Sequence, residues 1–209
     1  MKKVIVSRYN ENIDWLKDYD FDYIIYNKGM KVEGDFNVKD VENIGNNQRD
    51  IFQFIVENYE NLPEIMIFVQ ATPFDHCNRE KFDSCLNNTT FTPLESYSHI
   101  PINQAQCLDS EGGYMEINNS WYITAHNQTH NQICRFNSFD EFMDKIFKNY
   151  VPAYWNRFSP GSQYLITKEI SKHYPKKFWE YLMNMLNRNN MTEGHIIERA
   201  LLMIFKCEL

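Results

Sequence analysis

The first seventy residues alternate between short apolar runs and segments whose apolar residues recur at helical spacing. KKVIVSR (2–8), FDYIIYNKG (21–29) and EIMIFVQ (64–70) contain near-continuous apolar runs. Such runs are typical of strands covered on both faces. NENIDWLKDY (10–19) predicts a short helix, and NNQRDIFQFIVENYENL (46–62) a longer one that Pro63 ends. This order predicts an α/β fold: a three-layer α/β/α sandwich around a mostly parallel sheet.

In the second half of the chain, apolar runs and apolar residues at helical spacing alternate less regularly. Residues 30–45 are polar and predict a loop. REKFDSCL (79–86) and FDEFMDKIF (139–147) predict helices. Further strands are expected at GGYMEI (112–117), WYITAH (121–126) and within PGSQYLITKEI (160–170), and further helices at PKKFWEYLMNMLNR (175–188) and TEGHIIERALLMIF (192–205). Because the sequence shows no linker and no internal repeat, we expect a single domain over residues 1–209.

The composition of the chain argues against several classes of protein. Hydrophobic residues make up 43% of the chain, which is too many for a disordered protein. The formal net charge of -7 argues against a general nucleic-acid binder. No apolar stretch reaches the length of a secretory signal or a membrane span, so we expect a soluble, cytoplasmic protein. The five cysteines are scattered and include no CxxC, which disfavours a disulfide scaffold.

The candidate site lies where the predicted strands end. Ligands of α/β sheets bind at the carboxyl ends of the strands, and here those ends carry SRYNE, YNKG and QATPFDH. Asp75 and His76 are suited to a divalent metal or to acid–base chemistry. The alternative is that Asp75 caps the following helix and His76 lies on the surface. In SRYNE, Arg8 suits a phosphate and Asn10 or Glu11 a base or ribose; the alternative is a helix cap with a surface ion pair.

Three other groups of residues carry weaker signals. His126 and His130 are four apart, but they follow a strand-like run, so structural or surface roles are favoured. A zinc site at His76, Cys77 and Cys85 has no recognisable fourth ligand. The helix predicted over 192–205 places His195, Glu198 and Arg199 on one face, either as an ion pair or facing the strand ends. The sequence has no GxGxxG, P-loop, GxSxG or kinase signature.

Taken together, these motifs resemble a family that is defined only as a domain of unknown function. Its members share SRYNE, YNKG, an NxG turn, ENYxNLP and FxQxxPFDH, found here at 7–11, 26–29, 43–45, 57–63 and 68–76. A looser likeness continues through GSQYLITKEISKHYPKKFWEYL and HIIERALLMIF. The family in turn is distantly similar to glycosyltransferases of the GT-A type, which bind a nucleotide-sugar at the carboxyl edge of the sheet.

The resemblance implies a transferase that moves a sugar from a nucleotide-diphosphate donor to a glycan or other hydroxyl acceptor. Asp75, with His76, is expected to meet the diphosphate or its metal, Mn²⁺ or Mg²⁺. Asp75 and Glu198 are the candidates for the carboxylate base of an inverting reaction, and a retaining reaction is equally open. The motif is FDH rather than Asp-x-Asp, and Asn46 and Asn47 stand where the family has charged residues. The nucleotide and its diphosphate are expected at Arg8, Tyr9, Asn10, Glu11, Asn27, Lys28, Gln70 and Arg199.

Two other functions fit the same residues. The first is a non-catalytic protein that holds a nucleotide or glycan at the strand ends. The second is a metal-dependent hydrolase that uses Asp75, His76 and a distant histidine such as His195. Binding without turnover would indicate the first, and release of a product without an acceptor would indicate the second.

Overall fold

A computed structural model describes residues 1–95, 98–101, 107–109, 113–115, 135–136, 138–152, 155–187 and 193–206 of the chain. The strands are β1 (Lys2–Arg8), β2 (Tyr23–Asn27), β3 (Val38–Asp40), β4 (Ile65–Gln70), β5 (Thr92–Pro93), β6 (Ser98–Pro101), β7 (Cys107–Asp109), β8 (Gly113–Met115), β9 (Trp155–Phe158) and β10 (Tyr164–Thr167). The α-helices are α1 (Asn47–Glu57), α2 (Arg79–Leu86), α5 (Phe139–Ile146), α6 (Lys168–His173), α7 (Lys176–Met185) and α8 (Glu193–Lys206). Short 3₁₀ turns are η1 (Asp14–Asp18), η2 (Tyr59–Asn61), η3 (Pro73–Asp75) and η5 (Pro160–Ser162).

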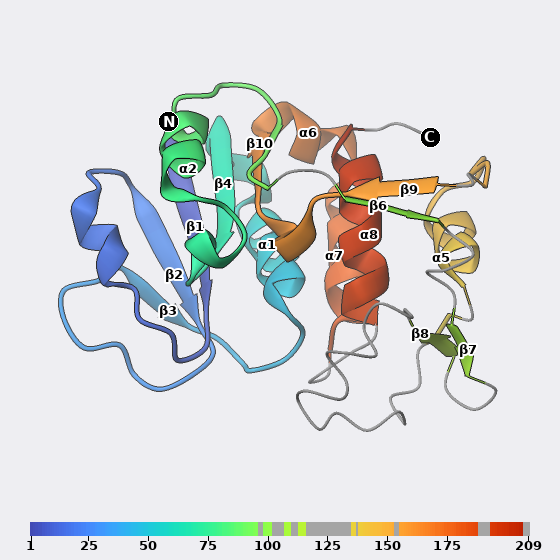
Figure 1. Ribbon diagram of the computed structural model, residues 1–209, viewed down its shortest axis with the longest axis horizontal. Helices are drawn as coiled ribbons and strands as arrows, with labels where there is room; N and C mark the ends of the chain where they lie inside the picture. Colours follow the sequence, from blue (N-terminus) through green and yellow to red (C-terminus); the bar gives the residue numbers. More distant parts are fainter. Residues whose placement is uncertain are drawn as a thin grey trace.

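The main sheet has six strands in the order β3-β2-β1-β4-β10-β5 (Figure 1). β1 is parallel to both β2 and β4, and β2 is parallel to β3. β10 runs antiparallel to β4 on one side and to β5 on the other. The predicted α/β class is confirmed, but the sheet is mixed, with one reversed strand between two that share a direction.

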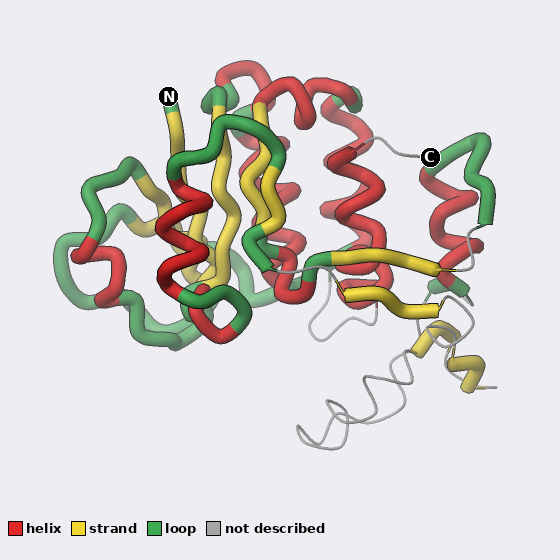
Figure 2. The backbone as a smooth tube through the Cα atoms, turned by 45° about the horizontal axis from the view of Figure 1, so that its top comes forward, coloured by secondary structure: helices red, strands yellow, loops and turns green. Residues whose placement is uncertain are grey.

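Each face of the sheet covers its own apolar core, and α1 and α2 lie on opposite faces (Figures 1 and 2). On β1, the side chain of Ile5 packs into the core with α1, α7 and α8, whereas Val4 and Val6 pack with η1 and α2. All three are at most 2% exposed. This alternation explains why the strand reads as a continuous apolar run, since both faces of the sheet are covered.

α2 begins where the sequence predicts it, but the interpretation of Asp75 as its cap is wrong. Asn78 is the N-cap of α2, and its side-chain oxygen accepts a hydrogen bond from the Lys81 amide at 2.8 Å. Asp75 therefore does not cap this helix, which leaves its carboxylate to be explained in another way.

Two further details differ from the sequence expectation. The segment 30–45, expected to be a loop, contains β3, which adds a short edge strand to the sheet. The helix expected over 10–19 is reduced to the single 3₁₀ turn η1, and at its start the Asn12 side chain accepts a hydrogen bond from the Asp14 amide at 2.6 Å.

The strand expected at 121–126 and the pair His126 and His130 lie outside the described residues. Within the described parts, no helix is long and apolar enough to cross a membrane.

Candidate functional site

The candidate site lies at the carboxyl edge of the sheet, between β1 and β4. From β1 the chain continues to β2 and β3 on one side, while β4 and β10 lie on the other. The direction of strand order therefore reverses between β1 and β4, and α/β sheets bind ligands in the crevice at such a point. α1 begins at this edge, so the partial positive charge of its N-terminus lies there as well.

The loop after β1 is tied to the loop after β2 through Arg8. Its guanidinium donates to the Asn27 side-chain oxygen at 2.6 Å and to the carbonyls of Met30 at 3.0 Å and Glu11 at 2.9 Å. Asn27 is only 2% exposed and donates in turn to Asp40 at 2.8 Å. Arg8 and Asn27 therefore fasten the ends of β1 and β2 to each other, and their polar groups are already engaged with the protein.

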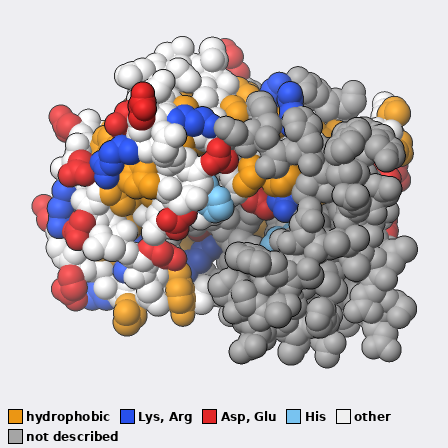
Figure 3. Space-filling model, viewed as in Figure 1, with side chains coloured by type: hydrophobic (Ala, Val, Ile, Leu, Met, Phe, Trp, Pro, Cys, Tyr) orange, Lys and Arg blue, Asp and Glu red, His pale blue; other side chains and the backbone are white. Residues whose placement is uncertain are grey.

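Gly29 allows these two loops to touch through their backbones. A Cβ atom at this position would lie 1.7 Å from the Tyr9 carbonyl oxygen. Asn10 completes the contact, because its side-chain oxygen accepts from the Met30 amide at 2.7 Å. The side chains of Tyr9 and Met30 are 51% and 70% exposed. Figure 3 shows a few hydrophobic side chains that project from the lower edge of the described part of the molecule.

Lys28 lies deeper and forms a buried ion pair with Asp50 of α1. The ammonium nitrogen is 3.0 Å from Asp50 Oδ1 and donates to the carbonyl of Asn46 at 2.9 Å. Ser7 of β1 donates a short hydrogen bond to the other carboxylate oxygen. Burial raises the pKa of Asp50, against the opposing effects of Lys28 and Ser7, and burial lowers the pKa of Lys28, against that of Asp50. The pair joins the end of β2 to the start of α1 and fixes the helix at the edge of the sheet.

The protein interior next to the Lys28–Asp50 ion pair has almost no empty space. A cavity of about 10 Å³ remains there, which is about the space of one water molecule. Its lining consists of Ile5, Ser7, Asn47, Asp50, Ile51, Phe68, Val69 and Ser162. The space beneath the ion pair is therefore too small for a ligand, and a ligand at this end of the sheet would lie over its open edge.

The PFDH turn is held against the end of β4 by Gln163, which is fully buried. Its side-chain amide donates to the Pro73 carbonyl at 3.1 Å, and its side-chain oxygen accepts from the Gln70 amide at 3.1 Å. Asp75 is exposed, and its carboxylate has no hydrogen bond or ion pair with any residue that the structure describes. Figure 3 shows acidic side chains and a histidine close together near the middle of the view.

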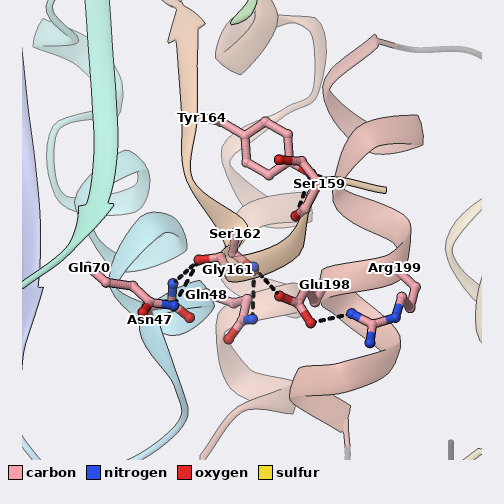
Figure 4. Close-up of polar contacts among 9 residues, drawn as sticks. All are labelled: Asn47, Gln48, Gln70, Ser159, Gly161, Ser162, Tyr164, Glu198 and Arg199. Carbon is pink, nitrogen blue, oxygen red and sulfur yellow. Dashed lines mark hydrogen bonds and ion pairs between the residues drawn. The ribbon is translucent and has the colours of Figure 1, made fainter. Parts of the chain in front are cut away.

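Gly161, in η5, forms hydrogen bonds with residues of α1, β4 and α8 (Figure 4). Its carbonyl accepts from the side chains of Asn47 at 2.8 Å and Gln70 at 3.0 Å, and its amide donates to Glu198 Oε1 at 2.7 Å. Gly161 has a φ of +80° and Ser162 a φ of +54°, which is unusual for a residue with a side chain. Such strain persists only where surrounding contacts determine the backbone, and here three elements do so.

The polar groups of α8 are engaged with one another and with η5. Glu198 Oε2 forms a short ion pair with Arg199, whose guanidinium carbon lies 3.8 Å from the ring centroid of Phe158. Burial lowers the pKa of His195, and Arg199 adds to this effect while Glu198 opposes it. α8 thus shows both arrangements that the sequence left open: Glu198 pairs with Arg199, and it also reaches η5 through the Gly161 amide.

Within the described residues, a metal would need further ligands from a substrate. Among the residues that the structure describes, no group of three or more His, Cys, Asp or Glu side chains is arranged to hold an ion. Asp75 offers one carboxylate, which suits Mg²⁺ or Mn²⁺ when substrate phosphates supply further oxygens. Cys77 and Cys85 are buried free thiols in the core beneath α2, and burial raises the pKa of Cys77 to about 11. A protonated thiol is a poor zinc ligand.

The predicted residues therefore fall into two groups along one edge. Arg8, Tyr9, Asn10, Glu11, Asn27 and Lys28 cluster at the ends of β1 and β2, whereas Gln70, Asp75, His76, Glu198 and Arg199 surround the end of β4 and η5. Sequence analysis missed Asp50 and Gly161. Asp50 was detectable as an acidic residue among the apolar positions of a predicted helix.

A family model described as a protein of unknown function (DUF3431) matches residues 4–209. The chain belongs to this family. The predicted membership in a family of unknown function is thereby confirmed. Searches of curated proteins and of solved structures returned no match to the chain.

Proposed function

We propose that this DUF3431 protein is a glycosyltransferase of the GT-A type that binds a nucleotide-diphosphate sugar over the edge between β1 and β4. The observation that carries the proposal is the carboxylate of Asp75, which has no partner among the described residues and follows β4 at the edge where the strand order reverses and where α1 begins. An acidic group at the end of a central strand is the feature that the resemblance to GT-A enzymes implies.

The two groups of residues along this edge suit the two ends of such a donor. At the β1–β2 end, the exposed ring of Tyr9 offers a surface on which a base can stack. Near its middle, the N-terminus of α1 favours a phosphate group, and the Asn46 N-cap does not occupy this end with its own side chain. The proposed donor therefore lies with its base over β1 and its diphosphate toward β4.

The chemistry requires neutralisation of the diphosphate as it leaves. An acceptor oxygen bonds to the anomeric carbon, while the bond from this carbon to the diphosphate breaks and leaves its electron pair on the phosphate oxygen. Asp75, with His76, would hold Mn²⁺ or Mg²⁺ together with the diphosphate oxygens, and the metal would supply charge stabilisation. Without a metal, this task falls to the helix N-terminus, because Lys28 and Arg199 already pair with carboxylates.

Donor binding tests the proposal directly. Thermal unfolding of the full chain is measured with a panel of nucleotides and nucleotide-sugars, each with and without Mn²⁺. A ligand at a hundred times its dissociation constant stabilises by about 2.7 kcal/mol, which gives a shift of a few degrees. Asp75→Ala should remove the Mn²⁺-dependent part of the shift, whereas Asp20→Ala, a matched change of an exposed aspartate, should not. If no nucleotide shifts the transition under any condition, the proposal fails.

One observation favours a non-catalytic binding protein as the second candidate. Both oxygens of Glu198, a predicted catalytic carboxylate, are engaged by the Gly161 amide and Arg199. A protein that only holds a nucleotide or glycan would show the thermal shift but neither transfer nor hydrolysis of the donor. Turnover of a donor that binds therefore decides between the two candidates.

A further inference from the structure

A second cavity lies on the α1 face of the sheet, toward the amino ends of β1 and β2. Its volume is about 300 Å³, which is within the range of small-molecule sites, whereas the cavity beside Asp50 holds about one water molecule. α1 packs on β1 and β4, so the same face of β2 and β3 extends past the helix (Figure 1). The cavity lies between these strands and the C-terminal end of α1, and therefore at the opposite end of this helix from the candidate site.

Part of the lining of this cavity is apolar. It consists of Ile24 and Tyr26 of β2, Phe54 of α1, and Pro63. Ile24, Tyr26 and Phe54 also pack in the core on the α1 face of the sheet, and Tyr26 is only 1% exposed. The apolar surface is therefore held in place by the fold itself, and it suits a ring or a short hydrocarbon body.

Two lysines and one glutamate supply the charge of the lining, which is net positive in a chain whose formal net charge is -7. Lys3 extends from β1 and Lys39 from β3, and their side chains are 21% and 39% exposed. The Lys3 ammonium lies 3.0 Å from Asp22, and that of Lys39 lies 2.6 Å from Glu57. Because an ammonium group has three N–H donors, each lysine keeps donors beyond the one used in its ion pair.

The carboxylate of Glu57 is already engaged with the protein. Its Oε2 accepts from the Tyr26 hydroxyl and from Lys39, both at 2.6 Å, and its Oε1 accepts from the Gln53 side chain at 2.8 Å. Burial raises the pKa of Glu57, but the hydrogen bonds from these three donors together lower it below its ordinary value. A cationic ligand would have to compete with these donors, whereas the acceptor oxygens of an anion can meet the spare donors of the two lysines.

We propose that this cavity binds a small organic anion, with a ring or short hydrocarbon body against Ile24 and Phe54 and a carboxylate or phosphate group facing Lys3 and Lys39. The inference does not rely on the proposed transferase function, because the cavity shares no residue with the edge that the donor would occupy. Inorganic phosphate would meet the lysines but leave the apolar lining uncovered, so the organic body adds to the affinity.

Titration of the isotope-labelled full chain with phenyl phosphate, followed by amide chemical shifts, tests the inference. Phenyl phosphate joins a ring to an anionic group, benzyl alcohol has the ring without the charge, and inorganic phosphate has the charge without the ring. Saturable shifts are expected at the amides of Tyr26, Lys39 and Asn58 (the cavity amides). Phenyl phosphate should bind at least about tenfold more tightly than either control compound. Benzoate is the carboxylate counterpart, and saturable binding of either anion at the cavity amides supports the inference.

Two variants remove a positive charge, and a third blocks the cavity. Lys3→Gln and Lys39→Gln should each weaken the binding of phenyl phosphate by about tenfold, because a hydrogen bond to a charged group is lost. Asn61→Trp, which changes an exposed residue of the lining, should weaken it by at least as much, since the indole fills part of the volume. Lys81→Gln is the matched control and should leave the affinity unchanged. Lys81 lies on α2, on the opposite face of the sheet, and its pair with Glu95 has side chains 34% and 26% exposed.

The outcomes separate this cavity from the edge of the sheet. Shifts at Tyr9 and Asp75 without shifts at the cavity amides would place the anion at the proposed donor site and overturn the inference. Equal affinity for benzyl alcohol and phenyl phosphate would overturn it as well, and so would full affinity in Asn61→Trp. Thermal unfolding of each variant is measured first, and if one of the three is unfolded, the other two decide. The absence of nucleotide binding in the thermal-shift panel would overturn the proposed function but leave this inference intact.

Discussion

The ion pair between Lys28 and Asp50 gives the sharpest test of how the site is built. The side chains are 7% and 1% exposed, so Lys28→Met would leave a carboxylate buried without its cation. Removing one partner of a buried ion pair destabilises a protein by about 3–5 kcal/mol. The same change also removes the hydrogen bond to the Asn46 carbonyl at the start of α1. We expect a loss of this size in the free energy of unfolding, measured by urea titration at pH 8.

The pH dependence of this loss tests its electrostatic cause. Burial already raises the pKa of Asp50 above its ordinary value of 3.8, and Lys28→Met removes the main opposing effect. The folded variant then holds a proton that the unfolded chain releases, so its stability rises as the pH falls from the raised pKa toward the ordinary one. The gain reaches at most about 1.4 kcal/mol per pH unit. The loss caused by Lys28→Met should therefore be smaller at pH 5 than at pH 8.

Two further variants serve as controls for this prediction. Lys168→Met removes an exposed ion pair with Glu64, whose side chains are 38% and 66% exposed, and should lose less than about 1 kcal/mol at every pH. The double variant Lys28→Met/Asp50→Leu removes both buried charges and should recover about half or more of the loss. An equal loss at pH 5 and pH 8, with no recovery in the double variant, would refute the assignment of a buried charge pair.

Three other predictions concern the loops at the edge of the sheet. Gly29→Ala should lower the free energy of unfolding by more than about 2 kcal/mol in a urea titration, because its Cβ would meet the Tyr9 carbonyl at 1.7 Å; unchanged stability would contradict this packing. Tyr9→Ala should change stability by less than about 0.5 kcal/mol but weaken nucleotide binding by about 1–3 kcal/mol in a calorimetric titration, and equal affinity would exclude base stacking. Gly161→Ala should destabilise the protein more when His76 is present than in a His76→Ala background, with a coupling energy of at least about 0.5 kcal/mol. The backbone strain at position 161 is common to both backgrounds. A coupling energy of zero would therefore show that the His76 ring does not rest on Gly161.

The fold was predictable where the pattern of apolar residues is local. The runs at 2–8, 23–27 and 65–70 are strands, and their shared direction follows from the helices and loops between them. The strand within PGSQYLITKEI was also predicted, as β10. Its antiparallel place between β4 and β5 was not, because an apolar run indicates a strand but not the direction in which it pairs. β3 was missed since it has only three residues and lies in a polar segment.

The sequence predicted the location of the candidate site better than it predicted the role of each residue there. The rule that ligands bind at the strand ends brought Arg8, Asn27 and Asp75 to one edge correctly. Whether a side chain there is free or engaged depends on contacts between distant residues. Gly161 meets Asn47 across 114 positions and Gln70 across 91, and no local pattern encodes such contacts.

The residues that the family motifs share are therefore not all residues that meet a ligand. Arg8, Asn27 and Gly29 fasten the loops to one another, so changes at these positions should act first on stability. Tyr9 and Asp75 expose side chains that make no hydrogen bond to the described parts of the chain, so changes there should act on binding. A protein that preserves rigid loops around a few free side chains keeps its recognition surface in position before a ligand arrives, which lowers the entropic penalty of binding. Separate effects on stability and on binding in these two sets of variants are what a preorganised site requires.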